Sequence, residues 1–304
     1  MSETQKEKTF ISAVVYLHDD ASVIKFLKEV DGELKDHFES YEYILVNDAC
    51  EKDIIDDCKV WSEGMNAPVT IINMSLYHGV EDAMNAGIDA AIGDFIYEFD
   101  SVQMPYDKKL ISKAYRQAVQ GNDIVCVCPE HINVGSRLFY KIFNNNSRSV
   151  YNIRTDAFRL VSRRAINRVH NSHLYMPYRK AAYAASGLKV CTISFEGKIS
   201  NTQKSKSSLA IDSLVMYTNA GYKVSIWITF FMMLVSVAEL IYTIVIFCIG
   251  KPIVGWTTTM LVMSFGFMGL FFVLSIVIKY MSINIDMNFR KQKYLIESIE
   301  KIQK

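Results

Sequence analysis

The sequence predicts an α/β head with a mostly parallel sheet, followed by a hairpin of two membrane-spanning helices. Over roughly the first 220 residues, short apolar runs rich in β-branched residues alternate with segments of helical periodicity, a pattern typical of α/β domains. Two later runs, 224–249 and 253–278, are almost entirely apolar and long enough to cross a bilayer. A chain of 304 residues has room for one large domain and one further module.

The head opens with four predicted strands that are separated by three predicted helices. The strands are the apolar runs 9–17, 41–46, 69–72 and 94–99. The helices are 21–37, about 51–63, and a third that ends near residue 92. This order predicts a largely parallel sheet with helices on both faces.

Polar side chains follow the ends of these strands. They include Asp20, Asp48, Ser75, Glu98 and Asp100. Because ligands of open α/β sheets bind beyond the carboxyl ends of the strands, we expect these residues at one crevice. Neighbouring carboxylates repel each other, and a divalent cation is the simplest way to stabilise them. No Gly-rich phosphate loop occurs, so a nucleotide would be held through a metal and side chains. Taken singly, each acidic residue could instead be a helix cap or a solvated loop residue.

A later segment, 131–153, has an apolar stripe with Arg137 and Lys141 beside it. The pattern suits an amphipathic helix. Such a helix could lie on the membrane, pack on a neighbouring subunit or belong to the core.

The two apolar runs contain one charged residue, Glu239, and are joined by the short link 250–252. A buried core hairpin is the alternative, but two adjacent runs of this length are rare in soluble cores. Lysine and arginine are frequent after the second run, whereas the link carries only Lys251. The positive-inside bias therefore predicts a cytoplasmic head (1–222), a transmembrane hairpin (223–279) and a basic cytoplasmic tail (280–304).

The composition narrows the classes of function. The net charge of +1 gives no support to nucleic-acid binding. None of the six cysteines forms a CxxC pair, so a reduced, cytosolic head is expected in preference to a disulfide framework. The polar N-terminus lacks the apolar stretch of a signal peptide.

Several motifs, in this order, resemble those of glycosyltransferase family 2. Residues 46–50 (VNDAC) resemble a V-D-D-G-S strand end, and 75–94 resemble an N-x-G-x-x-x-A-x-x-x-G-x-x-x-A-x-G-D segment. Residues 98–105 (EFDSVQMP) are similar to a D-x-D motif followed by proline, and 156–163 (DAFRLVSR) to D-x-x-F-R-L-x-S-R. With the two closing spans, the similarity extends over nearly the whole chain. It is greatest to the polyprenyl-phosphate glycosyltransferases, the group of dolichyl-phosphate mannose synthase and bacterial undecaprenyl-phosphate glucosyltransferases.

This resemblance implies a Rossmann-like GT-A fold and an inverting, metal-dependent hexosyltransferase at the inner membrane. The enzyme would move a sugar from a UDP- or GDP-sugar to polyprenyl phosphate for cell-surface glycan synthesis. The implied ligands of Mg²⁺ or Mn²⁺ are Glu98 and Asp100. The implied donor- and phosphate-binding residues are Asp20, Asp48, Ser75, Asp100, Arg163 and Lys206. The implied catalytic residues are Gln103, Asp156 and Arg159.

Three positions depart from the family pattern. Glu98 replaces the first Asp of D-x-D, Asn47 replaces the first Asp of the D-D pair, and Ala157 stands where many bacterial relatives carry an acid. These departures leave two alternatives open. The chain could be a transferase that uses a saccharide or lipid-linked glycan acceptor, or a catalytically impaired membrane scaffold of the same fold.

A processive polysaccharide synthase is not expected, because no Q-x-x-R-W motif occurs and two spans are few for an export channel. Small residues in the second run, Ser264, Gly266 and Gly269, would allow the hairpin to pack against a second copy of the chain.

Overall fold

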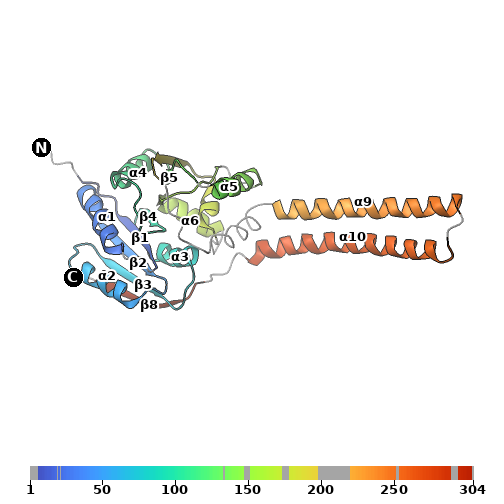
Figure 1. Ribbon diagram of the computed structural model, residues 1–304. Coiled ribbons are helices and arrows are strands. Elements are labelled where there is room, and N and C mark those ends of the chain that lie inside the picture. The colour runs from blue at the N-terminus through green and yellow to red at the C-terminus, as the bar shows by residue number, and fades with distance from the viewer. Residues whose placement is uncertain are drawn as a thin grey trace. The chain divides into compact units, whose positions relative to one another are not determined.

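A computed structural model (Figure 1) describes residues 6–18, 20, 22–132, 134–146, 151–172, 178–197, 220–250, 253–288 and 294–302. The chain divides into two compact units. Met1–Ser207 and Phe289–Lys304 form the first unit, which we call the head. Ser208–Asn288 forms the second unit, which we call the hairpin.

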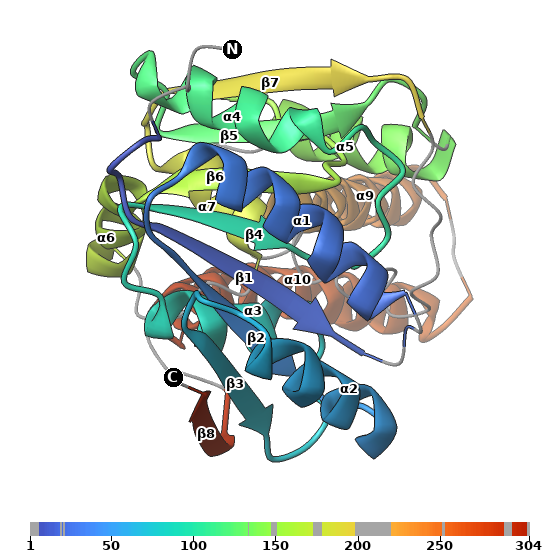
Figure 2. The same cartoon turned by 90° about the vertical axis from the view of Figure 1, so that its left-hand side faces the viewer.

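The described part of the head contains one mixed sheet of eight strands (Figure 2). The strands are β1 (Ile11–Leu17), β2 (Tyr41–Asn47), β3 (Val69–Met74), β4 (Phe95–Phe99), β5 (Ile124–Pro129), β6 (Phe158–Ser162), β7 (Val190–Phe195) and β8 (Ile296–Ile302). Their order is β7-β5-β6-β4-β1-β2-β3-β8. Strands β6 and β8 run antiparallel to their neighbours, and the others share one direction. The predicted fold class, a mostly parallel α/β sheet, is confirmed.

Helices cover both faces of this sheet. They are α1 (Val23–His37), α2 (Lys52–Glu63), α3 (Val80–Ala90), α4 (Lys109–Val119), α5 (Val134–Asn146), α6 (Arg163–Ser172) and α7 (Arg179–Ala185). Side chains alternate between the two faces along a strand. In β1, Ala13 and Val15 belong to the apolar core that also contains residues of α1, α2 and α4. Val14 points to the opposite face, toward α3.

A glycine seats α3 directly on the sheet. A Cβ at Gly87 would lie 2.5 Å from Val14 Cγ1 and 2.7 Å from Val46 Cγ2. Only a residue without a side chain allows this approach of α3 to β1 and β2. Gly93 does the same just before β4, because its Cβ would lie 2.6 Å from the backbone N of Ser12. The two glycines therefore fix the position of α3 and of the chain that enters β4.

Strand β8 lies in the segment that the sequence analysis interpreted only as a basic tail. It pairs with β3, which is the outermost of the predicted strands on the side away from β4. The Asn73 amide donates hydrogen bonds to Ser298 Oγ (2.9 Å) and Glu300 Oε1 (3.0 Å). Lys59 Nζ lies 2.8 Å from Glu300 Oε2. The apolar residues of β8 recur every third position, at 296, 299 and 302, whereas a half-buried strand is recognised by a period of two.

The hairpin consists of helices α9 (Ala220–Ile249) and α10 (Trp256–Asn288), which lie side by side (Figure 1). The rings of Tyr242 and Trp256 meet edge to face, with centroids 6.4 Å apart. Ser225–Ile249 and Trp256–Met281 are long and apolar enough to be candidate membrane spans. Their side chains are mostly exposed within the structure, whereas a core helix of a soluble protein would bury them.

The close contact at Gly87 gives a first testable prediction. Gly87→Ala is expected to lower the free energy of unfolding of the head by about 1–3 kcal/mol, because the new methyl group overpacks the contact with Val14 and Val46. The matched control is Gly32→Ala in α1, where a Cβ meets nothing within 4 Å. This control should stabilise the head by about 0.5–1 kcal/mol. Amide hydrogen exchange of β1 and β2 in the full chain measures both effects. Equal effects at the two glycines would contradict the close seating of α3.

Candidate active site

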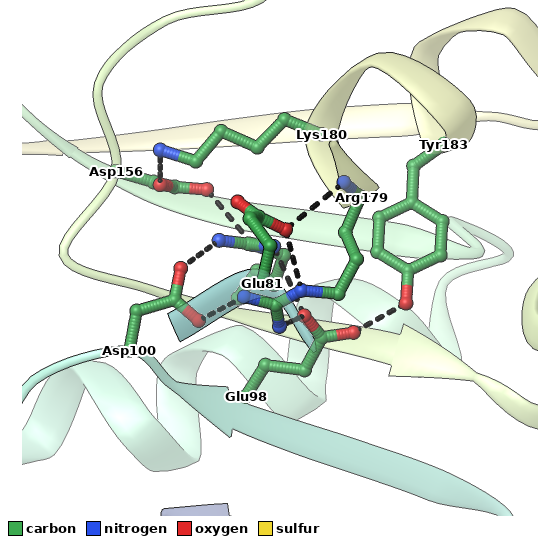
Figure 3. A network of polar contacts seen from close by, with 8 residues as sticks. Glu81, Glu98, Asp100, Asp156, Arg179, Lys180 and Tyr183 are labelled. Carbon is green, nitrogen blue, oxygen red and sulfur yellow. Dashed lines mark hydrogen bonds and ion pairs between the residues drawn. The ribbon is translucent and has the colours of Figure 1, made fainter. Parts of the chain in front are cut away.

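Charged side chains converge at the carboxyl end of β4, on the face of the sheet that carries α3. Figure 3 shows this group, which we call the ion-pair network. Its members are four acids, three bases and one phenol: Glu81, Glu98, Asp100, Asp156, Arg159, Arg179, Lys180 and Tyr183.

Strand pairing and helix packing bring these residues together. Glu98 in β4 lies opposite Arg159 in the antiparallel strand β6, so both side chains project from the same face. Glu98 is also the register partner of Val14 in β1, the residue that contacts α3. Glu81 lies in the first turn of α3. The short helix α7 supplies Arg179, Lys180 and Tyr183.

Glu98 is completely buried among donors. Its Oε2 accepts hydrogen bonds from Arg159 Nη1 (3.0 Å) and Arg179 Nη1 (2.7 Å), and its Oε1 accepts one from the Tyr183 hydroxyl. Burial raises the pKa of Glu98 despite the two arginines, which act in the opposite direction. Burial also raises the pKa of Tyr183, so the phenol keeps the proton that it donates to Glu98.

Asp100 is the network carboxylate with the most access to solvent, with 24% of its side chain exposed. Its Oδ1 accepts a hydrogen bond from Arg179 Nη2 (2.7 Å), and its Oδ2 accepts one from Arg159 Nη2. Burial acts to raise the pKa of Asp100, but Arg159, Arg179 and Lys180 outweigh it and hold the pKa well below its usual range. Asp100 is therefore an anion that bridges two guanidinium groups.

Each arginine also pairs, through its Nε, with one further carboxylate: Arg159 with Asp156 and Arg179 with Glu81. Asp156 accepts a hydrogen bond from Arg159 Nε (3.0 Å) and forms an ion pair with Lys180. Glu81 accepts hydrogen bonds from Arg179 Nε (2.8 Å) and from the Arg179 backbone N–H (3.1 Å). Each guanidinium thus donates to three carboxylates, which fixes its orientation.

A small cavity adjoins the network. Its volume is about 30 Å³, room for about one or two water molecules. Asp156, Arg159 and Lys180 contribute to its lining, together with Cys126 and Cys128. Burial raises the pKa of Cys128 to about 12 and that of Cys126 well above its usual value. Both thiols stay protonated at neutral pH and are poor nucleophiles.

The arrangement at Glu98 and Asp100 does not fit the divalent cation that the resemblance implies. Three of the four carboxylate oxygens of Glu98 and Asp100 accept hydrogen bonds from arginine. The fourth, Glu98 Oε1, accepts one from the Tyr183 hydroxyl. A divalent cation about 4 Å from one guanidinium would be repelled by about 8 kcal/mol at an effective dielectric constant of 20. Across the described ranges, no group of three or more His, Cys, Asp or Glu side chains is arranged to hold a metal ion.

Asp48 and Asp20 accept hydrogen bonds from backbone N–H groups of neighbouring loops. Asp48 is fully buried. Its carboxylate accepts hydrogen bonds from the N–H groups of His78 and Gly79 (both 2.8 Å) and from the Tyr16 hydroxyl (3.0 Å). It therefore holds the loop that begins α3, and its oxygens are turned inward, away from solvent. Asp20 accepts from Ser22 N–H (2.9 Å) and Ser22 Oγ (2.6 Å) in the turn before α1. The N-cap of α1 is Ser22, so Asp20 itself is not the capping residue.

The remaining predicted residues lie in different places. Ser75 donates to the Leu295 carbonyl through its N–H (3.1 Å) and its hydroxyl (3.3 Å), so it faces the C-terminal segment. Gln103 lies half-buried in the loop after β4, three residues beyond Asp100. Lys206 lies outside the described residues.

Arg163 lies apart from the other predicted site residues. It follows β6, and β6 runs antiparallel to β4, so Arg163 lies at the amino end of β4, opposite the crevice. Its guanidinium donates to the carbonyls of Gly93 (3.0 Å) and Ala91 (2.7 Å). Arg163 therefore supports the turn that enters β4, at the opposite edge of the sheet from Asp100.

Four members of the network were not predicted: Glu81, Arg179, Lys180 and Tyr183. One signal could have found three of them. Residues 178–186 read YRKAAYAAS, an alanine-rich segment short enough to be buried, which places Arg179 and Tyr183 four residues apart on one helix face. A buried arginine requires acidic partners.

An exposed ring pair lies near the buried Asp48. The rings of His18, just after β1, and Tyr77, in the loop after β3, have centroids 5.0 Å apart. His18 Nδ1 lies 3.0 Å from the carbonyl oxygen of Asp48. These rings offer an aromatic surface at the carboxyl edge of β1–β3.

The network gives a second testable prediction. Glu98→Leu should lower the free energy of unfolding of the head by about 3–5 kcal/mol, because two buried guanidinium groups lose their shared partner. The control is Lys59→Ala, which removes an ion pair whose side chains are 38% and 41% exposed and should cost less than about 1 kcal/mol. Amide hydrogen exchange of β4 and β6 reports both values. A Glu98→Leu effect as small as that of the control would show that the network does not hold the sheet edge together.

Comparisons with known proteins agree with this fold. The mannosyltransferase PcManGT from Pyrobaculum calidifontis, solved in complex with GDP-Man and Mn²⁺, is similar with a TM-score of 0.51 and 13% sequence identity. The match covers 69% of this chain and 63% of the mannosyltransferase, so this chain spans less than two thirds of its length. Glucosyl-3-phosphoglycerate synthase from Mycobacterium tuberculosis, in complex with phosphoglyceric acid, has a TM-score of 0.49 and 9% identity, with 68% and 78% of the two chains covered.

A sequence search among curated proteins gave no match. The sequence does match the family model described as "Glycosyl transferase family 2" over residues 21–187. The matched region is more than half of the chain and extends from the start of α1 to the end of α7. It contains every described member of the ion-pair network. The chain therefore belongs to glycosyl transferase family 2.

Proposed function

We propose that this protein transfers a sugar from a UDP- or GDP-sugar to polyprenyl phosphate at the cytoplasmic face of the inner membrane, for cell-surface glycan synthesis. The observation that carries the lipid acceptor is the pair of helices that follows the family 2 domain. Their apolar side chains are mostly exposed within the structure, so a bilayer is the environment that suits them. The basic residues that follow α10 support a cytoplasmic head.

The donor is assigned to the carboxyl edge of β1–β4. A similar fold, PcManGT, was solved with GDP-Man. In this chain the exposed rings of His18 and Tyr77 suit the nucleobase, because stacking on a ring does not depend on the identity of the base. Asp100 and its two arginines lie at the same edge and suit the diphosphate.

A lipid phosphate acceptor is compatible with the ion pairing of Asp156. This residue is buried and paired with both Arg159 and Lys180, so it orients these cations and is not available as a strong base. A lipid phosphate is already anionic near neutral pH and needs no strong base, unlike a hydroxyl acceptor. The step is proposed to proceed without a divalent cation at Glu98 and Asp100, because arginines already pair with both carboxylates.

The ion-paired state of Glu98 and Asp100 also favours a second candidate, a membrane scaffold that has lost transfer activity. One experiment separates the two. The full chain, purified in detergent, is incubated with radiolabelled UDP- and GDP-sugars and with undecaprenyl phosphate or a soluble saccharide. Label that enters the organic phase only with the lipid supports the proposal. Label on the saccharide identifies the other acceptor class, and no transfer from any donor favours the scaffold.

Gln103 provides a third testable prediction. Gln103 is half-buried in the loop that follows β4, three residues after Asp100 in the chain. If its amide donates to the transferred group, as the family resemblance implies, Gln103→Ala should reduce the transfer rate by about 10²-fold. The melting temperature should not change, since Gln103 lies outside the sheet and its helices. The matched control is Gln120→Ala at the exposed end of α4, which should leave the rate unchanged. Equal rates for both variants would remove Gln103 from the site.

A further inference from the structure

We propose that Arg159 and Arg179 bind the diphosphate of the donor directly, in place of a divalent cation, and that Asp100 occupies their anion site until the donor arrives. The inference rests on the proposed function, because it names the charge partner of the same donor site. It concerns two arginines that come from different elements, Arg159 from β6 and Arg179 from α7, and that both contact Asp100.

The two guanidinium groups are held in a fixed orientation. Nε of Arg159 donates to Asp156, and Nε of Arg179 donates to Glu81. Nη1 of both arginines donates to Glu98. The acids on this inner side are almost inaccessible, with exposed side-chain fractions of 3% for Asp156, 7% for Glu81 and 0% for Glu98.

The outer side of both arginines meets Asp100 alone among the network carboxylates. Nη2 of Arg159 and Nη2 of Arg179 donate to its two different oxygens. A carboxylate that bridges two guanidinium groups uses the donors that a phosphate would use, because arginine binds both anions through paired N–H groups. Two guanidinium groups also carry the same total charge as one divalent cation.

Asp100 is the member of the network that can leave. It is 24% exposed, and it follows β4 instead of lying within the strand. A rotation of its side chain breaks no ladder hydrogen bond of the sheet. The exchange replaces one anion by another at the same two arginines.

The test is a calorimetric titration of UDP and GDP into the full chain in detergent. One arm contains EDTA and the other contains excess Mn²⁺. We expect one of the nucleotides to bind in EDTA, with a Kd that Mn²⁺ changes by less than about twofold. Binding that requires Mn²⁺ would overturn the inference and leave the proposed function standing. Absence of binding in both arms would overturn the inference together with the proposed donor class.

Variants separate a bound anion from a metal ligand. Asp100→Asn removes the competing charge, so nucleotide binding in EDTA should be equal or tighter, whereas loss of a metal ligand would abolish binding. Arg179→Lys keeps the charge but loses the paired donors, and binding should weaken by about tenfold or more. Lys59→Ala serves as a control and should bind as the original chain does. The melting temperature of each variant verifies folding. Weaker binding by Asp100→Asn, with folding intact, would contradict the exchange.

Discussion

Two buried guanidinium groups govern how the carboxyl edge of the sheet is built. A buried arginine is tolerated only when its donors are matched by acceptors, and Arg159 and Arg179 draw theirs from four carboxylates. Those carboxylates come from α3, from β4 and the residue after it, and from the segment before β6. Because the two arginines need these acceptors, three separate parts of the family 2 domain meet around them.

The close packing of α3 on the sheet also helps to position the partners of these arginines. Gly87 lets the helix lie directly on Val14 and Val46, and Asp48 fixes the backbone at the helix start through His78 and Gly79. Together these contacts set the height of the first helical turn above the sheet. Glu81, which lies in that turn, can then reach Arg179 on α7. A sequence motif of spaced glycines therefore positions an ion pair that involves a residue almost a hundred positions later in the chain.

Local patterns predicted the first four strands and three helices, because apolar β-branched runs and helical periodicity are properties of short segments. They did not predict β8, whose apolar residues 296, 299 and 302 follow a period of three. The motifs at 98–100 and 156–159 brought together acids and an arginine that the structure also joins. Arg179 and Glu81 escaped detection because their pairing depends on the tertiary packing of α3 and α7. A motif also does not reveal that β6 runs antiparallel to β4, which places Arg163 at the opposite edge of the sheet from Asp100.

The pairing of β8 with β3 has a consequence for biosynthesis. The ribosome completes β1–β7 and then both apolar helices before the last strand exists. Until that moment β3 is an open sheet edge, with unpaired N–H and C=O groups that favour pairing with other chains. Closure of the edge therefore waits until both helices of the hairpin have been synthesised. A chain that ends before β8 would leave β3 uncovered, and its defect would be seen as aggregation of an otherwise folded head.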